Sequence, residues 1–266
     1  MYGLIAFFDI LGYQSFLENN SAEDNAKQVL DLINQLPNSV KKEFPQHWKP
    51  QFEPMIGKKF QSLVDAQQHV IFSDTIVLAL PYLEQEKKWR DAAIAYITIF
   101  ATHLSSRLFA RGLPTRGVIH EGNFLIQGTC LAGRCIVEAY RLCSLLDFAG
   151  LVYTPELSSK IFDPKDKNPP FVPASIGTFF VDYLSPLNNN TETRLWQLNW
   201  PHYFDPEDKK NCDADTNKYV LRSFWAHSKD CPSEVDRKVR ATSKLIRRLR
   251  IAQELYAERK APAKRR

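Results

Sequence analysis

The chain has 266 residues, 44% hydrophobic and 24% charged, which is the composition of an ordinary globular protein. That length allows one large domain, or one domain with a sizeable extension. No apolar run approaches the roughly 20 residues of a membrane helix, and the N-terminus has neither a basic region nor a cleavage site. We therefore expect no membrane span, no signal peptide and a cytoplasmic location.

The cysteine count and the distribution of charge further restrict which kinds of protein this chain could be. Five cysteines, an odd number without a CxxC pair, argue against a disulfide framework and structural zinc and favour reduced thiols in a cytosol. Residues 237–266 hold 12 of the 35 basic residues and 2 of the 30 acidic ones. We expect a solvated helix face and a frayed end there. The pattern does not favour a nucleic-acid arm, because Tyr256 is the only aromatic residue there that could stack on bases.

The first predicted elements are a strand and a helix. Residues 2–9 carry Phe, Ile and Leu on both alternating faces, which predicts a strand buried on both sides and therefore central in a sheet. A long helix is predicted over 22–42 from its three- and four-residue apolar spacing. We expect it to end before Pro45, Pro50 and Pro54, because proline interrupts helices.

A hairpin and a second helix come next. The apolar runs 68–72 and 75–80 flank a two-residue polar link, which predicts a hairpin with Asp74 at its tip. Residues 87–111 form an amphipathic helix with Gly112 as its C-cap.

Further along, the pattern predicts a strand over 113–121, a helix over about 133–146 and a strand over 151–153. Thr154 is expected to cap a short helix that starts at Pro155. This order matches a βαββαβ core with one extra helix–strand pair.

The chain is thus divided into two parts. Residues 1–163 are predicted to form the core. Residues 164–266 form a C-terminal extension with a proline-rich loop at 164–173, a strand hairpin over 177–200 and a long helix over 233–260, which packs on the core or on a dimer partner.

Two acidic residues stand out, because Asp9 and Asp74 each end a strand-like apolar run where a carboxylate has no packing role. Two acids on neighbouring strand ends are what a magnesium or manganese site needs to hold a nucleoside triphosphate. One buried Asp is usually a cap or an ion-pair partner. The second Asp at a matched position favours a metal site.

Motifs around these acids occur in an informative order. They are FDILGY at residues 8–13, FSDT at 72–75, RGVIHEG at 116–122 and GRCIVEAYRL at 133–142. Together, over roughly residues 1–160, they resemble class III nucleotidyl cyclases. The resemblance implies an α+β fold, the ferredoxin-like βαββαβ nucleotidyl-cyclase fold, here with a C-terminal extension ending in a long helix. It also implies an antiparallel sheet with helices mainly on one face.

The resemblance also implies a metal site. Asp9 and Asp74 match the two metal-binding aspartates of the family, and the carbonyl of Ile10 matches a backbone ligand. Two Mn²⁺ or Mg²⁺ ions per site are the implied cofactors. The family forms head-to-tail homodimers with active sites in the interface, so both aspartates would come from one subunit and Arg141 from the other.

The resemblance assigns nucleotide-binding roles as well. The amides of Leu11, Gly12 and Tyr13 match the turn that holds the triphosphate, and Arg141 matches the arginine that stabilises the transition state. Arg134 lies two turns before Arg141 on the same helix face and could reach phosphate too. Its plainer role is an i,i+4 ion pair with a glutamate.

Three departures from the family bear on the substrate. Val137 replaces a ribose-contacting Asn, and Val70 replaces a purine-reading Lys or Glu. Cys130 stands at the second base-reading position, which is Cys in guanylate cyclases. With one purine reader missing, a pyrimidine substrate becomes the natural suggestion.

The short chain and the Ser-Asp-Thr hairpin look like the pyrimidine cyclases of bacterial Pycsar anti-phage systems. That resemblance implies conversion of UTP to cyclic UMP and pyrophosphate, with the product activating a cyclic-nucleotide-responsive effector. A cytidylate cyclase, a guanylate cyclase (favoured by Cys130) and a degenerate nucleotide-binding module (favoured by Val137) remain alternatives. A nucleic-acid binder acting through the basic tail is the weakest option.

Overall fold

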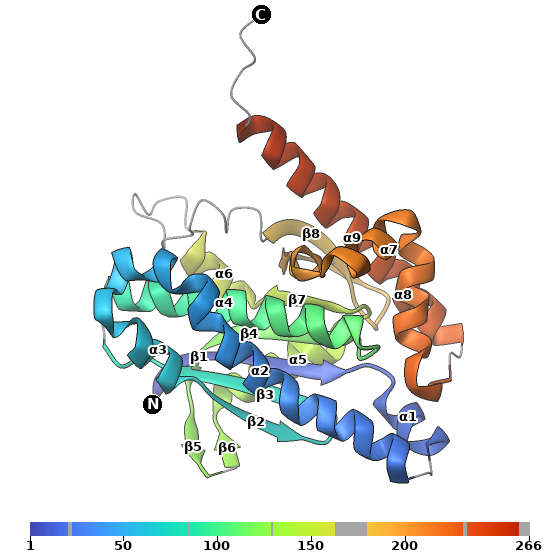
Figure 1. Cartoon of the computed structure of the whole chain (residues 1–266), viewed down its shortest axis with the longest axis horizontal. Helices are drawn as coiled ribbons and strands as arrows, with labels where there is room; N and C mark the ends of the chain where they lie inside the picture. Colours follow the sequence, from blue (N-terminus) through green and yellow to red (C-terminus); the bar gives the residue numbers. More distant parts are fainter. Residues whose placement is uncertain (21–22, 85, 129, 163–179, 231–232, 261–266) are drawn as a thin grey trace, which may run out of the picture.

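A mixed sheet of seven strands runs through the described part of the chain, in the order β2-β3-β1-β4-β7-β9-β8 (Figure 1). The computed structural model describes residues 1–20, 23–84, 86–128, 130–162, 180–230 and 233–260. The sheet strands are β1 (Tyr2–Ile10), β2 (Gln68–Phe72), β3 (Thr75–Pro81), β4 (Thr115–Asn123), β7 (Gly150–Tyr153), β8 (Phe180–Pro186) and β9 (Glu192–Leu198), and a separate small hairpin consists of β5 (Leu125–Gln127) and β6 (Cys130–Ala132).

Helices connect and cover these strands. The α-helices are α1 (Tyr13–Asn19), α2 (Glu23–Ile56), α3 (Phe60–Ala66), α4 (Lys87–Ala110), α5 (Arg134–Leu145), α6 (Pro155–Ile161), α7 (Pro206–Ala214), α8 (Thr216–Trp225) and α9 (Ser233–Lys260). Short 3₁₀ helices are η1 (Gly57–Lys59), η3 (Trp200–Tyr203) and η4 (Ala226–Ser228).

The first four strands of the sheet have ferredoxin-like topology. β1 lies between β3 and β4 and pairs antiparallel with both, while β2 pairs antiparallel with β3 at the edge. α2 connects β1 to β2, and α4 connects β3 to β4. The predicted α+β class, the βαββαβ core and the central position of the first strand are therefore confirmed, as is the extension that ends in a long helix.

Both faces of β1 are buried, because its two alternating sets of side chains are apolar. α2 and α4 cover one face of the sheet (Figure 1). On the other face α5 packs against β1 and β4, and α9 packs against β8. Side chains of α1, α3, α6, α7 and α8 join the core on the α2–α4 face, which agrees with the prediction of helices mainly on one face. The prediction of an antiparallel sheet was wrong at one pair, because β7 runs parallel to β4. The side chains of β1 that face α2 and α4 are Leu4, Ala6, Phe8 and Ile10, and those that face α5 are Ile5 and Phe7.

α4 is the central helix of the larger core. By length and composition alone it could cross a membrane, but 89% of its apolar window is buried inside the fold. Its sides contact α2, β1 and η3. The helix therefore packs between the sheet and α2 as part of the core.

α2 is longer than the sequence predicts. It continues through Pro45, Pro50 and Pro54 to Ile56, although proline removes a helix hydrogen bond and clashes with the preceding turn. The reason is tertiary packing: the ring centroid of Phe44 lies 4.5 Å from that of Tyr96 on α4, and the Phe52 and Phe60 centroids lie 5.3 Å apart with tilted rings. Burial of this aromatic face outweighs the local cost.

The C-terminal extension joins the same sheet. β9 pairs with β7 through Val152 and Gln197, and β8 closes the edge. α7 and α8 were not predicted, because they are short and α7 is mostly polar. Of the predicted features, the loop at 164–173, the first residues of the hairpin at 177–179 and the basic end at 261–266 lie outside the described residues.

Candidate active site

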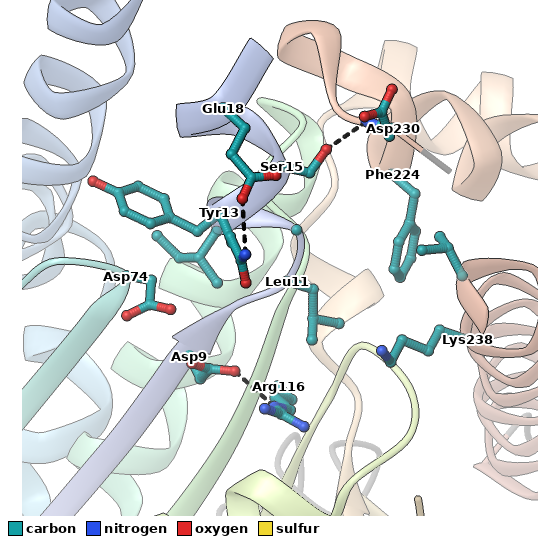
Figure 2. Close-up of a pocket in the computed structure, with 14 residues that line it drawn as sticks. Asp9, Leu11, Tyr13, Ser15, Glu18, Asp74, Arg116, Phe224, Asp230 and Lys238 are labelled. Atoms are coloured by element: carbon teal, nitrogen blue, oxygen red, sulfur yellow. Dashed lines mark hydrogen bonds and ion pairs between the residues drawn. The ribbon is translucent and has the colours of Figure 1, made fainter. Parts of the chain in front are cut away.

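A pocket of about 360 Å³ opens where β1 ends (Figure 2). Its floor is the end of β1 and the turn between β2 and β3, and its walls are α1, α8 and the start of α9. Asp9 and Asp74 both line it, together with the turn from Ile10 to Tyr13. The structure thus gathers into one cavity the residues that were predicted to bind metal and triphosphate.

Backbone pairing fixes the two acids beside each other. Asp9 lies opposite Thr75 in the β1–β3 ladder, and the amide of Ile10 donates to the carbonyl of Asp74 at 2.9 Å. The tight link before Asp74 is possible because Ser73 adopts a positive φ of 54°. The hairpin predicted from the two apolar runs therefore delivers its tip to the end of the central strand.

Asp9 is half-buried and forms an ion pair. The guanidinium Nε of Arg116 donates to Asp9 Oδ2 at 2.7 Å, and the same side chain donates to the carbonyls of Ser144 and Leu146. Burial raises the pKa of Asp9, Arg116 opposes that rise, and the nearby charge of Asp74 adds to it. Among the described residues, Asp9 Oδ1 has no hydrogen-bond partner.

Asp74, unlike Asp9, is not part of an ion pair among the described residues. Its half-buried carboxylate has no hydrogen-bond or ion-pair partner within the part of the chain that the structure describes. Figure 2 shows it on the side of the pocket next to Tyr13, with Asp9 nearby on β1. Burial followed by the Asp74 charge raises the pKa of the Tyr13 hydroxyl. An unpaired carboxylate beside a second one attracts cations.

The turn after β1 is shaped by Gly12, which has φ of 77° and precedes α1. The amide of Leu11 donates to the carbonyl of Pro114 at 2.8 Å. That amide is committed to the fold and is not open to a phosphate. The predicted anion-holding role therefore falls on the following amides, those of Gly12 and Tyr13.

Whether these residues suit a metal depends on their donor set. In the described ranges, no group of three or more His, Cys, Asp or Glu side chains could hold an ion. Mg²⁺, however, usually binds through one or two carboxylates, with substrate phosphates and water completing the shell. Asp74, the open oxygen of Asp9 and the Ile10 carbonyl fit that pattern, although Arg116 competes for the other oxygen of Asp9.

Other predicted residues lie outside the pocket of this chain. They are Val70, half-buried on β2; Cys130, exposed on β6; and Arg134 and Arg141, exposed on α5. Arg134 donates to Glu138 at 2.7 Å, its plainer predicted role. The Arg141 side chain has no partner among the residues that can be described. One chain alone thus brings the metal-site and turn residues together, without the base readers or either arginine of α5.

Sequence reasoning missed two cations of the pocket, Arg116 and Lys238. Arg116 opens the third motif, and its position directly across from Asp9 in the β1–β4 ladder is a signal that strand register could have provided. Lys238 carries no local signal. It reaches the pocket because α9 folds back across a chain separation of more than two hundred residues.

Comparisons with known proteins give little guidance. No family model matches this chain, and no curated protein matches it. One similar solved structure is the crystal structure of the guanylyl cyclase Cya2, with a TM-score of 0.37 and 11% identity, covering 75% of this chain and 94% of that one. The fold is therefore assigned from the strand order of the sheet alone.

Proposed function

We propose that this protein is a nucleotide cyclase that converts a pyrimidine nucleoside triphosphate, with UTP favoured, to the 3′,5′-cyclic monophosphate and pyrophosphate. The observation that carries the proposal is the placement of Asp9 and Asp74 side by side in a pocket that opens onto a glycine turn. Cyclase-like motifs occur around them in the family's order, at residues 8–13, 72–75 and 116–142.

In this reaction the ribose 3′-oxygen forms a bond to the α-phosphorus while the bond to pyrophosphate breaks, and the hydroxyl proton leaves to solvent. Bound Mn²⁺ or Mg²⁺ would lower the pKa of that hydroxyl and neutralise the leaving pyrophosphate. Asp9, Asp74 and the Ile10 carbonyl would hold the ions. The amides of Gly12 and Tyr13 would orient the phosphates at the start of α1.

A second copy of the chain would complete the site. The support for this is that Arg141, Cys130 and Val70 lie outside the pocket that holds the aspartates. Arg141 stands on a face of α5 that also exposes Val137 and Tyr140, with exposed fractions of 47% and 57%. Exposed apolar side chains next to an unpaired arginine suit a subunit interface. We therefore propose a head-to-tail homodimer in which Arg141 stabilises charge on the partner's reacting phosphate.

The base preference follows from the hydrogen-bonding groups at the two base-reading positions, Val70 and Cys130. Val70 has no hydrogen-bonding group, so it cannot read a purine edge as Lys or Glu would. Cys130 offers only a weak donor. Because Val70 leaves this pair without one of the family's two purine readers, we favour a pyrimidine. The cyclic product would act as a second messenger in anti-phage defence, through an effector that responds to it.

Two observations favour a second candidate, a nucleotide-binding module without turnover. Arg116 occupies one oxygen of Asp9, and Val137 replaces the ribose-contacting Asn of the family. A pocket that keeps this ion pair when nucleotide binds would hold ligand without assembling the metal site.

Product analysis separates the candidates. The purified protein is incubated with each of the four nucleoside triphosphates and Mn²⁺, and products are identified by mass spectrometry. Cyclic UMP with equimolar pyrophosphate is the expected result. Cyclic GMP alone would reassign the substrate, and tight UTP binding with no cyclic product would favour the binding module. Neither turnover nor binding of any nucleotide would overturn both.

A further inference from the structure

Lys238 is the residue that links the C-terminal extension to the pocket. It lies near the start of α9 and lines the same cavity as Asp9 and Asp74. Figure 2 shows its side chain extending from α9 toward the part of the pocket that contains Leu11 and Arg116. We propose that Lys238 binds the triphosphate of the substrate in the chain that carries the aspartates, an inference that rests on the proposed function.

The charges of the pocket call for such a residue. Four acids line it, and only Arg116 and Lys238 are basic among the described lining residues. Arg116 is occupied by Asp9 and by two backbone carbonyls. Lys238 is half-buried and, within the described ranges, has neither a hydrogen bond nor an ion pair. A ligand with several negative charges, entering beside acidic groups, needs a cation that the fold has not already used.

α9 is held firmly enough to position this amine. Arg237, the residue before Lys238, forms an ion pair with the buried Asp147. Thr242 accepts a hydrogen bond from the amide of Ala149 at 2.8 Å, and Leu245 is fully buried against the sheet. Because these contacts fix the helix, the lysine projects from a rigid element, and its backbone needs no ordering when a ligand binds.

The segment before α9 is tied to the helix that begins at the pocket. The amide of Asp230 donates to Ser15 Oγ at 2.6 Å, and Asn20 donates to the carbonyl of His227 at 2.8 Å. Asn19 donates to the carbonyl of Ser228 at 2.9 Å. The extension therefore forms one wall of the site, and α1 and α9 enclose the space into which a phosphate chain would extend.

A binding experiment tests the role of Lys238 without turnover. The ligands are 3′-deoxyUTP, which cannot cyclise, and 3′-deoxyUMP, each with Mn²⁺ and measured by calorimetry on the full chain. A charge-assisted hydrogen bond contributes roughly 1.5–3 kcal/mol, so Lys238→Gln should weaken 3′-deoxyUTP binding by about 10- to 100-fold. Binding of 3′-deoxyUMP should be unchanged. Lys238→Arg should keep most of the affinity.

Lys244→Gln is the matched control, because it makes the same change on the same helix at an exposed position. If Lys238→Gln binds 3′-deoxyUTP as tightly as this control, or loses both nucleotides equally, the inference is overturned. Its failure is distinct from failure of the cyclase proposal. If Lys238→Gln binds 3′-deoxyUTP as wild type does and the wild-type protein forms cyclic product, only the proposed role of Lys238 is rejected. If Lys238→Gln selectively loses triphosphate binding but the wild-type protein forms no cyclic product, only the proposed cyclase activity is rejected.

Discussion

Arg116 lies directly opposite Asp9 across the β1–β4 pair and holds one oxygen of its carboxylate at 2.7 Å. A metal ion on the open oxygen of Asp9 would share this carboxylate with the guanidinium. A cation already sitting on the ligand lowers the affinity of the site for a second cation, because the two repel. The pocket is thus expected to bind metal weakly as long as Arg116 remains paired with Asp9.

Removing the arginine should therefore strengthen metal binding in the absence of nucleotide. We expect Arg116→Gln to bind Mn²⁺ about tenfold more tightly than wild type, as loss of one nearby charge implies. Electron paramagnetic resonance of free Mn²⁺ measures this directly. Arg134→Gln removes an arginine outside the pocket and serves as control. Equal or weaker Mn²⁺ binding by Arg116→Gln would show that the Arg116–Asp9 ion pair does not lower the affinity of the site for metal.

The ionised carboxylate of Asp9 should destabilise the fold at neutral pH. Its pKa is raised by burial, with Arg116 opposing and Asp74 adding to the rise. A carboxyl group with a raised folded pKa contributes stability below its unfolded value, and that contribution is lost as pH rises through the folded value. Asp9→Asn should thus leave Tm at pH 7 unchanged or higher, with the difference shrinking toward pH 4. A lower Tm for Asp9→Asn at pH 7 would mean that the ion pair outweighs burial.

Glu121 shows the opposite behaviour at the far end of β4. Burial would raise its pKa, but hydrogen bonds from Arg90, Lys160 and Tyr82 outweigh this and lower the pKa to about 2. The carboxylate therefore stabilises the fold above its ordinary pKa, and that stability is lost as pH falls toward 2.

We expect Glu121→Gln to reduce the free energy of unfolding by about 1.5–3 kcal/mol at pH 7, as losing hydrogen bonds to a charged group does, because the remaining cations Arg90 and Lys160 are partly exposed. Urea unfolding measures it. Asp182→Asn, which breaks the exposed pair with Arg194, should cost less than about 1 kcal/mol. Equal losses in the two variants would show that the buried network contributes no more than a surface pair.

Much of the core followed from local patterns. The apolar alternation on both faces of β1, the hairpin around Asp74 and the long apolar helix α4 were visible, because each is set by residues close in sequence. α2 was not, since its continuation through Pro50 depends on aromatic packing with α4. In α2, tertiary contacts outweighed the low helix propensity of proline.

The candidate site was predictable in the same uneven way. Asp9 and Asp74 could be paired from the sequence, because both end strands that a βαββαβ core brings together. Arg116 needed the register of β4, and Lys238 needed the path of the whole extension. Residues that enter a site from distant segments leave no periodic signal, so only the folded chain reveals them.

The proposed sharing of active sites between two subunits predicts a specific rescue. Asp74→Asn and Arg141→Ala should each be inactive alone, yet their co-expressed mixture should recover about a quarter of wild-type activity, because half the dimers are mixed and each has one intact site. The measurement is cyclic product per total protein. Asp9→Asn mixed with Asp74→Asn should recover nothing, since both lesions fall on one subunit's side. Rescue by that second pair, or none by the first, would rule out the proposed arrangement.

The number of Mn²⁺ ions bound per chain in the presence of 3′-deoxyUTP tests the metal claim most directly. With both carboxylates intact, we predict two ions per chain, and loss of ions in both Asp9→Asn and Asp74→Asn at unchanged Tm or higher. Asp230→Asn, at the pocket rim, should keep both ions. Wild-type protein that binds nucleotide without Mn²⁺, or aspartate variants that bind as many ions as wild type, would contradict the account.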